Sequence, residues 1–146
     1  MGKTKYDFYV AGRTRNAENI RRVVELIRKC GKTCYCFLES SYDEDGFAHS
    51  GDPNELMNYF ESLGQNHPLV DKVFKRDIEA EKQSHNFLLV LPAGISGQAE
   101  AGIAYGLGKK LYLLGKIEKP ETLYGIFDKH FLNEAELEIF LKEVGG

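Results

Sequence analysis

The chain lacks a strong excess of charge of either sign. Its 146 residues include 19 Lys and Arg and 22 Asp and Glu, which gives a formal net charge of −3. A chain with this balance has no general attraction for the nucleic-acid backbone, which proteins bind by neutralising many phosphates. We therefore expect no nucleic-acid polymer as a partner.

The sequence also lacks a long apolar run. No stretch approaches the ~20 apolar residues that are needed to span a bilayer. The N-terminus MGKTKYDFYV has a strand-like pattern and no signal-peptide cleavage site. We expect no membrane partner, a cytoplasmic location and, because the length suits one compact core, a single domain over residues 1–146.

Cysteine is scarce, and its spacing does not match a secreted disulfide framework. The three cysteines Cys30, Cys34 and Cys36 follow a C-x3-C-x-C pattern with no histidine nearby. This spacing matches none of the common zinc patterns, so we expect buried or half-buried free thiols, with a metal site as the alternative. The sequence also has no Walker loop, complete GxGxxG fingerprint or Ser-His-Asp grouping, so a kinase or dehydrogenase lacks support and we expect no cofactor.

Strand-like and helix-like segments alternate along the chain. Residues 87–91 (FLLVL) are apolar without alternation, which is typical of a central parallel strand covered on both faces. The predicted strands are 6–11, 33–38, 87–91, 111–114 and 129–131, and the predicted helices run from 16 to the glycine at 31 and over 53–63, 68–83, 98–107, 121–126 and 133–144. This order predicts an α/β fold, a doubly wound parallel sheet of about five strands with helices on both faces, like a flavodoxin or Rossmann fold.

The first candidate site follows the first predicted strand. In open parallel sheets, ligands bind beyond the carboxyl ends of the strands. Gly12, Arg13, Thr14 and Arg15 lie at such an end and combine backbone N–H groups with guanidinium donors, as an anion site requires. The alternative is a solvated basic turn whose glycine serves only the backbone.

The second candidate site is the turn-rich segment 92–97, which includes Ser96 and Gly97 and leads into Glu100. Glu100 is expected in the first turn of the next helix, where the helix dipole favours an ionised carboxylate. Small residues surround it and would let a ligand approach closely. A nucleophilic carboxylate is one interpretation, and an acid placed favourably at a helix start is the other.

Asp77 stands out in the helix predicted over 68–83. Val70, Val73, Phe74 and Ile78 form the apolar stripe, and Asp77 falls inside that stripe. Because Asp is seldom buried without a partner, an inward acid near the active edge of a sheet is a candidate general acid or ligand for a polar substrate group. A structural hydrogen-bonding role is the alternative.

Three segments together resemble the nucleoside 2-deoxyribosyltransferase superfamily, including its 2′-deoxynucleoside 5′-phosphate N-hydrolase branch. They are FYVAGRTR, VFKRDIEAEKQSHNFLLVLPAG and SGQAEAGIAYGLGKKLYLL, and they span most of residues 8–114. The resemblance implies that Glu100 is the nucleophile, that Asp77 is the acid near the leaving base, and that Tyr9 orients the sugar and the nucleophile. Tyr9 would otherwise be read equally well as a core aromatic residue of the first strand.

The resemblance also implies the substrate and the assembly. The expected activity is cleavage of the N-glycosidic bond of a nucleoside or nucleoside 5′-monophosphate, by homodimers or higher homo-oligomers whose subunits help to close the site. Gly12, Arg15 and Ser96 fall near positions that hold the 5′-phosphate in the hydrolase branch, and the missing aspartate before Glu100 favours that branch. Two alternatives are a TIR-like domain that cleaves NAD and a nucleotide-sensing module without turnover.

Overall fold

The computed structural model describes residues 5–39, 58 and 61–143. Five parallel strands form one sheet in the order β2-β1-β3-β4-β5. The strands are β1 (Tyr6–Ala11), β2 (Cys34–Cys36), β3 (Ser84–Val90), β4 (Lys110–Leu114) and β5 (Lys129–Phe131). The predicted α/β fold with a doubly wound parallel sheet is confirmed.

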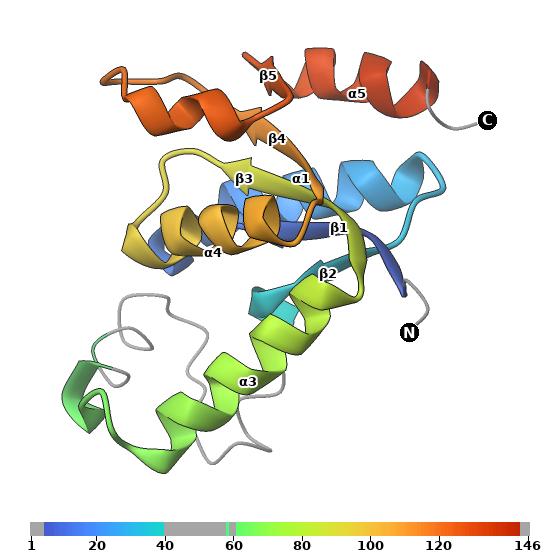
Figure 1. Ribbon diagram of the computed structural model, residues 1–146. Helices are drawn as coiled ribbons and strands as arrows, with labels where there is room; N and C mark the ends of the chain where they lie inside the picture. Colours follow the sequence, from blue (N-terminus) through green and yellow to red (C-terminus); the bar gives the residue numbers. More distant parts are fainter. Residues whose placement is uncertain (1–4, 40–57, 59–60, 144–146) are drawn as a thin grey trace.

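Within the described residues, four helices cover the two faces of this sheet, as Figure 1 shows for α1 and α4 on opposite sides of β1 and β3. They are α1 (Ala17–Lys29), α3 (Pro68–Lys82), α4 (Ile95–Gly106) and α5 (Glu134–Glu143). The residues of α1 and α5 pack on one face, and those of α3 and α4 pack on the other. No helix in the described ranges is both long and apolar enough to cross a membrane.

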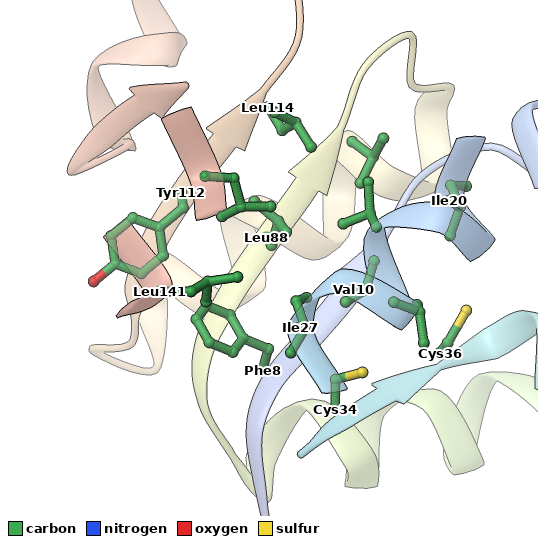
Figure 2. Close-up of a cluster of buried hydrophobic side chains, with 14 of the residues drawn as sticks. Phe8, Val10, Ile20, Ile27, Cys34, Cys36, Leu88, Tyr112, Leu114 and Leu141 are labelled. Atoms are coloured by element: carbon green, nitrogen blue, oxygen red, sulfur yellow. The ribbon is translucent and has the colours of Figure 1, made fainter. Parts of the chain in front are cut away.

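The face under α1 and α5 is a continuous apolar core (Figure 2). Ile20 and Ile27 of α1 are 0% exposed because the helix repeats apolar residues at three- and four-residue spacing and turns that stripe onto the strands. Cys34 and Cys36 are buried in this core as free thiols, and Cys30 is half-buried. This face therefore stabilises the fold, and the polar groups described below lie on the opposite face.

Several element boundaries differ from those predicted. β2 ends at Cys36, where a 3₁₀ turn over Phe37–Glu39 begins, and β3 begins at Ser84 rather than at residue 87. The helix predicted over 53–63 lies largely outside the described residues, although residues 58 and 61–63 are helical. The main correction concerns α4, which begins at Ile95, three residues earlier than predicted.

Candidate active site

A row of stacked aromatic rings crosses three strands on the face under α3 and α4. Tyr9 of β1 is in register with Tyr35 of β2 and with Phe87 of β3. The Tyr9 ring stacks between the other two, with centroid distances of 5.3 Å to Tyr35 and 5.7 Å to Phe87. Because side chains alternate along a strand, this register places both phenol groups on one face of the sheet.

The Tyr9 hydroxyl donates a hydrogen bond to Glu100 Oε2. Glu100 projects from α4, and the helix is held against the strands by the small buried residues Ala101 and Ala104. The pKa of Glu100 is raised to about 7: burial raises it most, the Tyr9 hydrogen bond lowers it, and the charge of Asp77 raises it. Burial, and next the charge of Glu100, raises the pKa of Tyr9, so Tyr9 remains a hydrogen-bond donor.

The position of Glu100 corrects one part of the sequence argument. Because α4 begins at Ile95, Glu100 lies in the second turn, beyond the free N–H groups of the helix start. The helix dipole acts mainly within the first turn. The ionisation of Glu100 is therefore controlled by burial and by Tyr9 rather than by the helix terminus.

Asp77 faces inward, as its place in the apolar stripe predicts. The Tyr35 hydroxyl donates to Asp77 Oδ1 at 2.8 Å, and Arg76 Nε lies 3.8 Å from the same oxygen. Phe74, predicted to share this stripe, is instead 57% exposed, whereas Ala80 and Glu81 are buried further along α3.

Sequence reasoning missed two polar residues on this face. Tyr35 could have been found from the Cys34-Tyr35-Cys36 alternation, which turns it away from the two buried cysteines. Glu81 lies four residues after Asp77, so its spacing places it on the same helix face. Glu81 is 0% exposed, and its neighbours include the charges of Glu100 and Asp77.

The two predicted anion-binding loops meet at the carboxyl end of the sheet. A side-chain carbon added at Gly97 would lie 3.7 Å from the Gly12 backbone nitrogen, and one added at Gly94 would lie 3.8 Å from Arg13 Cβ. Ser96 and Gly97 form the first turn of α4 rather than the loop before it, so their backbone N–H groups have no partner within the helix.

The two arginines of the first loop are both exposed. Arg15 lies in the 3₁₀ turn over Thr14–Asn16, and its Nη2 atom is 3.6 Å from Glu61 Oε1. The structure therefore brings Glu100, Asp77 and Tyr9 together on one face and places Gly12 beside Gly97 at its edge. Within the described ranges, no group of three His, Cys, Asp or Glu side chains is arranged to hold a metal ion.

Comparisons with known proteins show a similarity in fold but no match in sequence. No protein-family model matches the sequence, and no curated protein matches it either. Among solved structures, the chain is similar to a 2-deoxyribosyltransferase from the psychrotolerant bacterium Bacillus psychrosaccharolyticus, with 19% sequence identity and a TM-score of 0.61. The match covers 90% of this chain and 89% of that one, so the two share a fold along nearly their whole lengths.

Proposed function

We propose that the chain is an N-glycosidase or deoxyribosyltransferase that acts on a nucleoside or nucleoside 5′-monophosphate through Glu100. The observation that carries this proposal is the pairing of Glu100 with the Tyr9 hydroxyl beside a second inward acid, Asp77. Two carboxyl groups in one partly dry site are the groups that glycosidic bond cleavage with a covalent intermediate requires. The similar fold of a 2-deoxyribosyltransferase supports the same reaction class.

The contacts assign a role to each group in the reaction. Tyr9 binds Glu100 Oε2 and so orients the carboxylate, which leaves Oε1 to attack the anomeric carbon. As the bond from that carbon to the base breaks, the base takes up a proton that Asp77 donates or relays. Water or a second base then displaces Glu100 from the sugar and completes the turnover.

The edge of the site supports a 5′-phosphate as part of the substrate. The first-turn N–H groups of α4 and the loop at Gly12 and Arg13 lie side by side, and Arg15 follows in the same loop. Backbone N–H groups at a helix start and guanidinium groups both bind phosphate. We assign the 5′ end of the substrate to this edge, with Gly12, Arg13, Arg15, Ser96 and Gly97 as its binding residues.

The test is a chromatographic screen for base released from nucleosides, nucleoside 5′-monophosphates and NAD. Glu100→Gln should lower release by at least ~100-fold, because glutamine keeps the shape of the side chain but cannot attack the anomeric carbon. Glu25→Gln, at an exposed position of α1, is the matched control and should keep wild-type turnover.

Three outcomes of this screen contradict the proposal. Full activity of a folded Glu100→Gln protein would remove Glu100 as the nucleophile. Release of nicotinamide from NAD alone would favour an NAD-cleaving enzyme. Tight nucleotide binding without release of any base would favour a sensing module.

A further inference from the structure

Glu81 is a buried acid for which the reaction described above has no use. It lies in the last turn of α3 and is 0% exposed. Neither of its carboxyl oxygens has a hydrogen-bond partner among the described residues. Buried polar groups are almost always hydrogen-bonded, so an exception of this kind at an active site indicates a function.

The surroundings of Glu81 favour its neutral form. A carboxylate without hydrogen bonds in an apolar environment is so costly that such a group takes up a proton instead. Burial, and next the charges of Glu100 and Asp77, raise the pKa of Glu81 to about 8. Lys109, whose Nζ donates to the Lys82 carbonyl at 2.9 Å, opposes these effects only in part.

Asp77, one helical turn earlier, has the opposite surroundings. The Tyr35 hydroxyl donates to its Oδ1 at 2.8 Å, and Arg76 Nε lies 3.8 Å from the same oxygen. Two acids four residues apart on one helix face also repel each other when both are charged. Glu81 is the acid of this pair whose carboxyl oxygens accept no hydrogen bond from the described residues, so the geometry favours its neutral form.

We infer that Glu81 is a positioning residue that holds the proton which Asp77 passes to the leaving base. This inference rests on the proposed function. In the first step a bond forms from Glu100 to the anomeric carbon, the bond from that carbon to the base nitrogen breaks, and the proton of the Asp77–Glu81 pair moves to that nitrogen. One negative charge thereby passes from Glu100 to the pair.

The second step returns this charge. The attacking water bonds to the anomeric carbon and gives a proton back to the pair, while Glu100 leaves as a carboxylate. Tyr9 of β1 is buried near the charges of Glu100, Asp77 and Glu81, and burial and these charges raise its pKa, so it keeps its own proton in both steps. Without Glu81, the base would have to take its proton from Asp77 alone, whose Oδ1 already accepts a hydrogen bond from Tyr35.

The experiment compares two substrates that differ in their need for an acid. One is a purine nucleoside or monophosphate that the wild-type protein cleaves. The other is the same compound methylated at N7, whose cationic base departs as a neutral molecule without a proton. At pH 7, Glu81→Gln should lower kcat at least about tenfold on the first substrate and less than about threefold on the second.

Two further variants control for structural effects. Glu79→Gln removes an exposed carboxylate of the same helix, one that accepts a hydrogen bond from Gln83, and should lower neither rate. Glu81→Leu removes the proton but fills the buried space with an apolar side chain. It should show the same dependence on substrate, which keeps the test decisive if Glu81→Gln does not fold.

The possible results separate this inference from the proposed function. Equal losses on both substrates, or no loss on either, would overturn the role of Glu81 while leaving Glu100 as the nucleophile. If the wild-type protein releases base from no nucleoside or nucleotide, the proposed function fails and the role of Glu81 fails with it.

Discussion

Tyr9 controls the ionisation of Glu100 through a single hydrogen bond. Burial raises the pKa of Glu100 to about 7 although this bond, which stabilises the ionised carboxylate, lowers it. Tyr9→Phe keeps the ring between Tyr35 and Phe87 but removes the donor. The pKa of Glu100 should therefore rise in this variant, and a larger fraction of the nucleophile should be protonated at neutral pH.

The measurement is the pH dependence of kcat/KM for base release. For a nucleophile that must be ionised, kcat/KM rises with pH and levels off above the pKa, here about 7. A hydrogen bond to a charged group contributes about 1.5–3 kcal/mol, so Tyr9→Phe should move this rise upward by about one pH unit or more. Tyr6→Phe alters another phenol on the same face and should leave the pH of this rise unchanged. An unchanged profile for Tyr9→Phe would show that Tyr9 is only a core residue.

The elements of this fold were predictable where apolar residues repeat at a regular spacing. The apolar positions of α1 and the continuous run in β3 predict their elements within a few residues, because each buries a face against the core. The start of α4 was not predictable from its turn-rich residues. Gly97 belongs to the helix, where an added side-chain carbon would lie 2.9 Å from Leu89 Cδ1, and only the folded sheet reveals this contact.

The candidate site shows the same limit. Asp77 could be identified because it interrupts an apolar stripe, which is a local pattern. The stacking of Tyr9 with Tyr35 and Phe87 depends on the register of strands that are far apart in the sequence. Tyr35 was therefore missed although it lies in a segment that was correctly predicted as a strand. Glu81 was missed because its burial depends on how α3 meets α4 and the sheet.

The two loops at the carboxyl edge of the sheet act together if the substrate carries a 5′-phosphate. We expect nucleoside 5′-monophosphates to be cleaved with a higher kcat/KM than the corresponding nucleosides. Arg15→Ala should narrow this preference about tenfold to hundredfold, since a charge-assisted contact contributes about 1.5–3 kcal/mol. Its present neighbour Glu61, at 3.6 Å, is exposed, and a surface ion pair of this kind is weak enough for a phosphate to replace.

Arg22→Ala is the matched control for this measurement. Arg22 also forms a surface ion pair, with Glu134 at 3.2 Å, but it lies on α1 away from the two loops. Its replacement should leave the preference for the monophosphate unchanged. Equal kcat/KM for a nucleoside and its monophosphate in the wild-type protein would place the chain functionally with the transferases.

At the scale of the whole molecule, the outer side of α4 is unusual for a surface helix. The only charged residue of α4 is Glu100, which faces the site. Apart from Gln98, whose Nε2 donates to the Tyr124 hydroxyl, the solvent-exposed positions carry apolar or small side chains, including Ile95 at 90% exposure and Tyr105 at 60%. A helix that is apolar on its outer side as well is typical of one that is covered by another molecule. We propose that a second copy of the chain covers it.

Gly102 offers a direct test of this assembly. It is exposed on α4, and an added side-chain carbon would meet no other atom within 4 Å, so an arginine there is compatible with the fold of one chain. We expect light scattering after size exclusion to give twice the mass of one chain for the wild-type protein and the mass of a single chain for Gly102→Arg. Ile139→Arg, at a position of α5 that is 60% exposed on the other side of the sheet, should remain dimeric.

Because the neighbouring subunit is proposed to help close the site, Gly102→Arg should also release base more slowly while circular dichroism shows an intact fold. A wild-type protein that is monomeric at the concentrations of the activity assay would instead mean that one chain forms the complete site.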